Sequence, residues 1–346
     1  MTPSTGPYHI LEPRGYPGLL SLVIPCYNEE PTIPYLRSEV SAFLETLPCP
    51  VEVILVNDGS RDGTLKALAE WARIDSRIKI LHLSRNFGHQ IASTAGLDHA
   101  GGDAVVLIDA DLQDPLKAIH GMIDLYRQGY DVVYGRRGRR PSESRVKRLT
   151  AWLFYRLMRF LVYRDLPVDV GDFRLISRDC LNALTQMREC HRFLRGMVTW
   201  IGFPQTEMVY ERQPRRAGES KYPMTKMLMF AWTAATSFST IPLSLSFLFG
   251  GIIGLFGLEE ACRALLAHFL GWYAVPGWTS LMVVNSLVGS VLLIGFGVLG
   301  QYIGRIYEQS KDRPLYIVAR RVNCERDGQA GPSEPSERRT VEGSRR

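Results

Sequence analysis

Several patterns that would assign this chain to a common class of protein are missing from it. Its six cysteines, in 346 residues, form no C-x-x-C pair and show no zinc spacing, so we expect reduced thiols that pack as small apolar groups. The polar loops after the first two predicted strands do not resemble G-x-G-x-x-G, which disfavours a nicotinamide enzyme. The first residues contain no basic segment followed by an apolar run, so we expect no export signal there.

Charged residues are missing from two long stretches in the C-terminal half. Neither Met227–Leu258 nor Ala264–Gly304 contains Asp, Glu, Lys or Arg. Each stretch is longer than the roughly 20 apolar residues that cross a bilayer. The first 220 residues instead mix charged and apolar positions as soluble domains do. We therefore predict a head followed by two transmembrane helices.

Basic residues flank the predicted spans unevenly. The connection between the spans, residues 259–278, carries only Arg263, whereas basic groups stand before the first span and after the second. These groups are Arg212, Arg215, Arg216, Lys221 and Lys226, and Arg305, Lys311, Arg313, Arg320 and Arg321. The positive-inside rule then predicts a cell-membrane protein with its head and both termini in the cytoplasm. A net charge of +6 fits nucleic acid or anionic lipid, and the spans favour membrane lipid, so we expect no nucleic-acid partner.

The head alternates apolar runs with segments of helical spacing. Predicted strands lie at residues 19–24, 51–56, 78–83, 104–108 and 131–134, and Thr64–Arg73 is an example of the helices between them. This rhythm predicts an α/β fold with a parallel, doubly wound sheet. Ligands of such sheets bind beyond the carboxyl ends of the strands.

An acidic cluster follows the predicted strand at 104–108. Asp109 and Asp111 point the same way if the segment is extended, because alternate side chains share a face. Gln113 and Asp114 follow directly. Hard oxygen donors in this arrangement suit Mg²⁺ or Mn²⁺, which would in turn hold a diphosphate. The sequence therefore predicts a metal site at this edge of the sheet.

Two further polar segments end the first two strands. In Pro25-Cys-Tyr-Asn-Glu29, Tyr27 offers a stacking face and Glu29 an acceptor for sugar hydroxyls. In Asn57-Asp-Gly-Ser60, Asp58 is placed to accept from a base N–H. Each segment could instead be only a turn or a helix cap.

A basic loop and a predicted helix over residues 145–164 follow the fifth strand. Arg145, Arg148, Arg156 and Arg159 fall on one stripe of that helix, and the remainder is mostly apolar. The pattern favours a helix lying in a membrane surface. A helix buried in the head with a solvated arginine face is the alternative.

Together these motifs resemble glycosyltransferase family 2, which has the GT-A fold, and within it the polyprenyl-phosphate glycosyltransferases. The family elements P-x-Y-N-E, N-D-G-S and D-x-D stand here as Pro25–Glu29, Asn57–Ser60 and Asp109–Asp111. The resemblance extends from about Leu19 to Val318. Its other motifs are Ser84–Gln90, a turn at Gly171–Leu175, Arg216 with Gly218–Tyr222, and Gly300–Tyr307.

The resemblance implies a role for each matching residue. Pro25, Tyr27, Glu29 and Asp58 would bind the nucleoside of the donor. The metal on the diphosphate would be held by Asp109, Asp111 and Gln113. Catalysis would depend on Asp172, Asp111 and Arg174, with Asp172 on the acceptor side, where the family residue is often assigned as a base. Candidates for the lipid phosphate or the leaving diphosphate are Arg136, Arg137, Arg174, Arg216 and Lys221.

The chemistry leaves the role of Asp172 open. A phosphate monoester acceptor is mostly dianionic near pH 7 and needs no strong base, so Asp172 could orient a metal, sugar or arginine instead. Two anions must still meet, which requires a cradle of Arg or Lys.

The expected function is inverting transfer of one sugar from a nucleotide sugar, with UDP favoured, to a polyprenyl phosphate such as undecaprenyl phosphate. Two alternatives are a processive polysaccharide synthase and a non-catalytic nucleotide-sugar-binding membrane protein. Gln186-Met-Arg does not fit the synthase motif Gln-x-x-Arg-Trp, and the intact acidic residues argue against lost catalysis. The sequence does not identify which sugar is transferred.

The resulting domain plan has four parts. We expect a disordered tail over 1–18, a GT-A domain with a juxtamembrane helix over 19–235, two transmembrane helices over 236–305 and a cytoplasmic segment over 306–346, disordered from about 325. Glycines along both spans favour close helix packing and a homo-oligomer.

Overall fold

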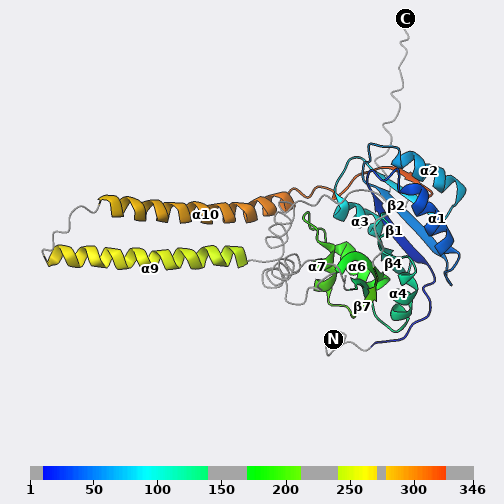
Figure 1. The fold of residues 1–346 in the computed structure, drawn as a ribbon, viewed down its shortest axis with the longest axis horizontal. Helices are drawn as coiled ribbons and strands as arrows, with labels where there is room; N and C mark the ends of the chain where they lie inside the picture. The colour runs from blue at the N-terminus through cyan, green and yellow to red at the C-terminus, as the bar shows by residue number, and fades with distance from the viewer. Residues whose placement is uncertain (1–10, 139–169, 212–240, 271–277, 325–346) are drawn as a thin grey trace, which may run out of the picture.

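A computed structural model describes residues 11–138, 170–211, 241–270 and 278–324. It consists of an α/β head and two long helices that extend away from the head (Figure 1). The described part of the segment expected to be a tail, residues 11–18, lies against the head, where Arg14 pairs with Asp131 at 3.0 Å. The predicted helix at 145–164 lies outside the described residues.

An eight-stranded sheet forms the centre of the head, in the order β7-β5-β6-β4-β1-β2-β3-β8. The strands are β1 (Leu20–Cys26), β2 (Val51–Asn57), β3 (Ile78–Leu83), β4 (Ala104–Leu107), β5 (Val132–Arg137), β6 (Val170–Ser177), β7 (Gln205–Tyr210) and β8 (Val318–Val322). β1, β2, β3 and β4 are parallel neighbours, as are β5 and β7, whereas β6 and β8 run antiparallel to the strands beside them. The mostly parallel sheet expected for a GT-A-like domain is confirmed.

Helices cover both faces of the sheet, which explains why its central strands are continuous apolar runs. On one face, α1 (Ile33–Leu44), α2 (Thr64–Ile74) and α4 (Ala118–Arg127) pack against side chains such as Leu22 and Leu55. On the other face, α3 (His89–Asp98), α6 (Arg178–Gln186) and α7 (Leu194–Ile201) pack against Val23 and Ile54.

β6 carries Asp172, and its position differs from what the sequence predicted. Gly171–Leu175 is not a turn but part of this buried strand, between β4 and β5. β6 runs antiparallel to β4, with Leu107 opposite Arg174. The first residues of β6, including Asp172, therefore lie at the carboxyl edge of β4, beside the acidic cluster.

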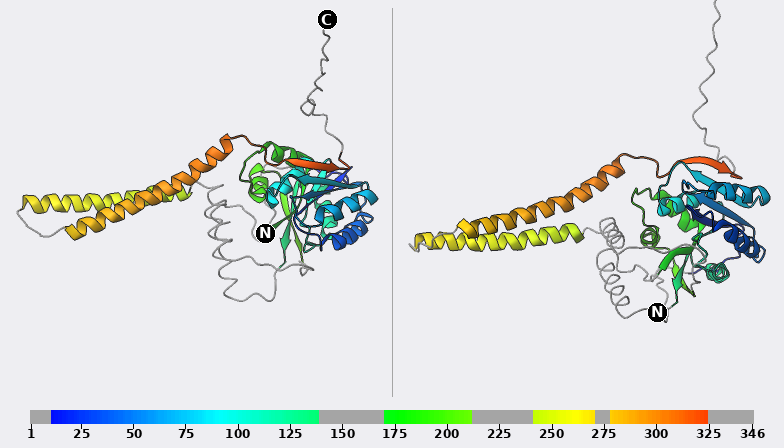
Figure 2. Two further views of the ribbon diagram at one scale, coloured as in Figure 1. Left: turned by 90° about the horizontal axis from the view of Figure 1, so that it is seen from above. Right: turned by 45° about the horizontal axis from the view of Figure 1, so that its top comes forward.

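The two long helices are α9 (Ile241–Phe269) and α10 (Trp278–Ser310), which lie side by side (Figures 1 and 2). Among the described residues, one segment, Leu287–Ser310, is long and apolar enough by length and composition to span a membrane. α9 continues through Glu259, Glu260 and Arg263 to Phe269, so the first part of the connection expected at 259–278 is helical.

After α10 the chain returns to the head. β8 pairs with β3 as an edge strand, with Ile80 opposite Val322. The Asn323 side chain, just beyond, donates Nδ2 hydrogen bonds to the carbonyl oxygens of Ala72 and Ile78 at 2.8 and 2.9 Å. The head thus holds the chain on both sides of the long helices.

Candidate active site

The loops that follow β1 and β2 are joined into one structural unit. The Asn28 N–H donates to Ser60 Oγ at 3.0 Å, and the Arg61 N–H donates to Asn28 Oδ1 at 2.9 Å. Asn28 has a φ of +53°, a conformation that asparagine tolerates better than most residues. Two neighbouring strand ends thereby present a single polar surface at the carboxyl edge of the sheet.

The predicted nucleoside residues differ in exposure. Pro25 is buried, whereas the Tyr27 side chain is 42% exposed and can offer its ring for stacking. Glu29 is partly buried, and its Oε2 accepts a hydrogen bond from Thr32 Oγ1 at 2.7 Å. The structure therefore places Tyr27 and Glu29 together on the accessible side of this loop unit.

Asp58 is buried and holds the loop that precedes α3. Its Oδ1 accepts from the Phe87 N–H at 2.7 Å, and its Oδ2 accepts from the Gly88 N–H and Asn86 Nδ2, both at 3.0 Å. Gly88 has a φ of +96°, which favours glycine. Asp58 thus fixes the start of α3; its contact with a nucleoside base stays a prediction.

The acidic loop after β4 has a constrained backbone. Leu112 has a φ of +54°, an uncommon conformation for a bulky residue and one that recurs at functional sites. The Gln113 N–H donates to Asp111 Oδ1 at 3.2 Å, and the Tyr210 hydroxyl, at the end of β7, donates to the buried Asp114 carboxylate. The loop is therefore held from inside and from a second strand.

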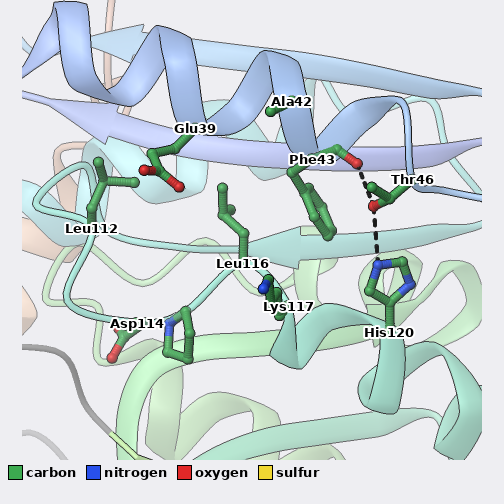
Figure 3. Close-up of a pocket in the computed structure, with 10 residues that line it drawn as sticks. Glu39, Ala42, Phe43, Thr46, Leu112, Asp114, Leu116, Lys117 and His120 are labelled. Atoms are coloured by element: carbon green, nitrogen blue, oxygen red, sulfur yellow. Dashed lines mark hydrogen bonds between the residues drawn. The ribbon is translucent and has the colours of Figure 1, made fainter.

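Figure 3 shows a hollow on the other side of this loop, between α1 and α4. Leu112 and Asp114 line it together with Phe43 of α1 and His120 of α4. His120 Nε2 lies 3.1 Å from Thr46 Oγ1 at its end. The lining includes neither Asp109 nor Asp172, so the hollow borders the back of the acidic loop rather than the candidate catalytic centre.

The described residues could supply only some of the ligands that a divalent ion needs. Within the described ranges, no group of three or more His, Cys, Asp or Glu side chains could hold a metal ion. Asp109 Oδ1 is nevertheless buried without a hydrogen-bond donor in that part of the chain, 3.5 Å from His89 Nε2. Mg²⁺ sites commonly combine one or two carboxylates with substrate phosphates and water. The acidic loop fits that kind of site, and Gln113, which is buried, stands beside it.

Asp172 lies across the sheet edge from Asp109 and is surrounded by donors. Its Oδ1 accepts from Arg195 Nε at 2.8 Å, and its Oδ2 accepts from Gln90 Nε2 at 3.0 Å. His89 Nε2 lies 3.3 Å from Oδ2, so one imidazole contacts both aspartates. The start of α3, the start of β6 and α7 therefore meet at this carboxylate.

The pKa values of the two aspartates are shifted in opposite directions. Burial raises the pKa of Asp109 to about 6, because the opposing attraction of His89 is the smaller effect. Burial also acts to raise the pKa of Asp172, but the hydrogen bond from His89 and the charge of Arg195 outweigh it and hold that pKa well below its usual range. Burial opposes protonation of His89, yet its pKa is raised because it faces both carboxylates.

The basic residues expected to bind phosphate are arranged differently. Arg174 is buried, donates Nη2 to the Gly171 carbonyl at 3.1 Å and contacts the backbone of Asp172, and burial lowers its pKa to about 10. Arg136 lies at the carboxyl edge of β5 and pairs with Glu207 at 3.0 Å. Arg174 thus supports the chain around Asp172. The side chains of Arg137, Arg216 and Lys221 lie outside the described part.

Three residues at this centre were not among the predicted site residues. His89 and Gln90 belong to the Ser84–Gln90 motif, which was a usable signal. Arg195 stands in no motif, and only the packing of α7 against α3 and the sheet brings it to Asp172.

Comparison with known proteins places this site in a family. Residues 21–185 match the model of glycosyl transferase family 2. The chain is 43% identical over 305 residues to the uncharacterized glycosyltransferase YkcC of Bacillus subtilis, covering 88% of this chain and 94% of that protein. It is 40% identical over 300 residues to the bactoprenol glucosyl transferase of Shigella phage SfV, covering 86% and 97%. It is 38% identical over 301 residues to a prophage bactoprenol glucosyl transferase homolog of Escherichia coli, covering 87% and 98%. The chain therefore belongs to glycosyltransferase family 2.

Proposed function

We propose that the protein transfers one sugar from a UDP-linked donor to undecaprenyl phosphate at the cytoplasmic face of the cell membrane, with inversion at the sugar C1. The observation that carries the proposal is the pair Asp109 and Asp172, bridged by His89, in a chain 40% identical over most of its length to a bactoprenol glucosyl transferase. That name makes glucose the first sugar to test.

The donor lies on the joined loops after β1 and β2. Tyr27 stacks on the base, Glu29 accepts from a sugar hydroxyl, and Asp58 keeps the adjoining loop in place. Asp109, Asp111 and Gln113 would hold Mg²⁺ or Mn²⁺, and the buried Asp109 Oδ1, which accepts no hydrogen bond within the described ranges, supports this assignment. When bound, the ion neutralises charge on the departing nucleoside diphosphate as a Lewis acid.

The acceptor phosphate is its own nucleophile. One of its oxygens forms the new bond to C1 as the bond from C1 to the diphosphate breaks, and the electron pair leaves with UDP. A dianionic monoester needs no proton removed, and Asp172 already accepts from Gln90 and Arg195. Asp172 therefore orients its neighbours rather than acting as a base. The basic residues that the family resemblance assigns to phosphate, Arg136, Arg137, Arg216 and Lys221, are the candidates for a cradle that brings the two anions together.

The long helices hold the lipid acceptor beside the head. Both α9 and α10 cross the membrane, with the head and both termini in the cytoplasm, and the glycine-rich spans allow a homo-oligomer. The surplus of basic residues on the head side supports this topology. A reporter fused near residue 270 should read as external, and one at the C-terminus as cytoplasmic. The opposite pattern would overturn the topology.

The deciding experiment incubates the full chain in membranes with undecaprenyl phosphate and a panel of radiolabelled nucleotide sugars, with Mg²⁺ or Mn²⁺. We expect one donor, UDP-glucose first among them, to give a lipid-extractable product with a single sugar. A polymer would favour the synthase alternative, and binding of donor without any product would favour the non-catalytic one. Asp124→Asn, an exposed change on α4, serves as the matched control for changes in the acidic loop.

A further inference from the structure

The foot of α10, Glu308 and Gln309, is bound to a segment of the head. Gln309 uses both ends of its side chain: Oε1 accepts from the Cys190 N–H at 2.9 Å, and Nε2 donates to the Arg188 carbonyl at 3.0 Å. Glu308 Oε2 lies 2.6 Å from His191 Nε2. The last turn of α10 is therefore fixed to residues 188–191.

The same segment reaches the candidate catalytic centre a few residues later. The Leu194 N–H donates to Gln90 Oε1 at 3.0 Å, while Gln90 Nε2 donates to Asp172. Arg195 donates directly to Asp172 at 2.8 Å. Leu194, the first residue of α7, is buried in the core that α7 shares with α3 and the sheet, so packing fixes this end of the segment. We call residues 188–195 the linking segment.

A second route runs through α3. Arg188 Nη1 lies 2.7 Å from Asp98 Oδ2, and the hydroxyl of Tyr316, which follows α10, donates to the same oxygen at 2.9 Å. Asp98 is the last residue of α3, and His89 and Gln90 are its first two. Both routes from α10 therefore end at one carboxylate, Asp172.

We propose that the foot of α10 positions Asp172 for the transfer reaction, acting through the linking segment and α3. The proposal rests on the proposed function, because it takes Asp172 to serve transfer to a lipid phosphate. A helix that served only as an anchor would need no more than a loose connection to the head. Here the helix end is hydrogen-bonded to the segment that supplies Arg195. Gln309 is thus a positioning residue, far along the chain from the group it affects.

The first test measures hydrogen–deuterium exchange in the full chain, reconstituted in lipid nanodiscs. Gln309→Leu keeps a side chain of similar size that can neither donate nor accept. We expect faster exchange of the Cys190 amide and also of the Leu194 amide, which Gln309 does not touch. Ser310→Ala is the matched control, since the Ser310 hydroxyl donates to the Tyr307 carbonyl of its own helix. Faster exchange confined to Cys190 would overturn the proposal.

The second test measures transfer. Gln309→Leu should lower kcat roughly 2- to 30-fold, the range of coupling mutations, with the KM for the donor unchanged. Combined with Arg195→Lys, its effect should be smaller than the product of the single losses, because both changes act on Asp172. Losses that multiply would contradict the coupling. If the wild-type chain forms no lipid-linked sugar, the proposed function fails, whereas exchange at Leu194 still decides whether the foot and the segment are coupled.

Discussion

The end of β4 and the start of β6 place two aspartates at one edge of the sheet, and their surroundings could hardly differ more. Asp172 is buried and accepts hydrogen bonds from Gln90 and Arg195. Asp109 Oδ1 is buried and accepts no hydrogen bond in the described part of the chain, where its partner is His89 Nε2 at the longer distance of 3.5 Å. His89 forms ion pairs with both, at 3.5 Å to Asp109 and 3.3 Å to Asp172. Two chemically identical side chains therefore stand in different sites. We call the site of Asp172 completed, because the protein supplies its hydrogen-bond donors, and that of Asp109 uncompleted.

The difference separates structural from ligand-binding roles. A buried carboxylate is stable when every oxygen has a donor, and leaving one oxygen unpaired costs about 1–3 kcal/mol. The protein meets this requirement at Asp172 with its own side chains. At Asp109 it supplies only the 3.5 Å ion pair with His89 within the described ranges, and burial raises the pKa of Asp109 to about 6. A cation brought with the substrate would complete the surroundings of Asp109, which is why we propose metal binding for Asp109 and positioning for Asp172.

The largest expected effect comes from breaking the uncompleted site. Asp109→Asn should lower metal-dependent transfer by roughly two to four orders of magnitude, since a metal contributes several kcal/mol of charge stabilisation. Thermal stability should stay the same or rise, because burial disfavours the charged form of Asp109 more than the attraction of His89 favours it. Asp111→Asn should lose activity in the same way with membrane insertion intact. Transfer assays and thermal unfolding test both, and full activity would refute the metal assignment.

Breaking the completed site should cost less activity and more stability. Asp172→Asn leaves Arg195 and His89 without their carboxylate, so we expect the free energy of unfolding to fall by about 1–3 kcal/mol. Misplacement of these groups should lower kcat by roughly ten- to a hundredfold, with donor affinity little changed. Calorimetry and transfer kinetics would measure both. A much larger loss of kcat at unchanged stability would instead identify Asp172 as a proton acceptor.

The sequence was most informative where strands are buried on both faces. Runs rich in apolar residues predicted β1 to β5, although Glu52 interrupts the run of β2, and Lys79 and His82 interrupt that of β3. β6 escaped this pattern, since a buried Asp172 and a buried Arg174 interrupt it. β8 escaped for another reason: it is an edge strand with exposed Arg320 and Arg321, and its partner β3 lies on the other side of the long helices in the chain.

The candidate site shows the same division. Asp109 and Asp172 stand in local motifs, so their types and order could be read directly. The role of Asp58 depends on a loop that the fold brings to it from beyond α2, and no local pattern reports those hydrogen bonds. Arg195 depends on packing between α3 and α7. Contacts of this kind follow from tertiary structure and not from residue spacing.

The smallest expected effect on activity concerns a third carboxylate, which sharpens the contrast between the first two. Glu52, near the amino end of the inner strand β2, is buried, and both of its oxygens have partners: Oε2 pairs with Lys79 Nζ at 2.6 Å, and Oε1 accepts from Ser21 Oγ at 2.5 Å. Glu52→Gln should lower the free energy of unfolding by about 1–3 kcal/mol and leave kcat unchanged. Chemical unfolding and transfer assays measure the two quantities.

The pH dependence of that loss gives its cause. Burial opposes ionisation of Glu52, but the bonds from Lys79 and Ser21 outweigh it and lower its pKa below 4.5. A carboxyl whose pKa is depressed on folding contributes stability that is complete above the unfolded value and is lost as the pH falls through the folded value. The stability gap between wild type and Glu52→Gln should therefore be full at pH 7 and narrow below about pH 4.5. A gap independent of pH would mean that Glu52 acts through its shape, and the distinction between completed and uncompleted carboxylates would then not rest on charge.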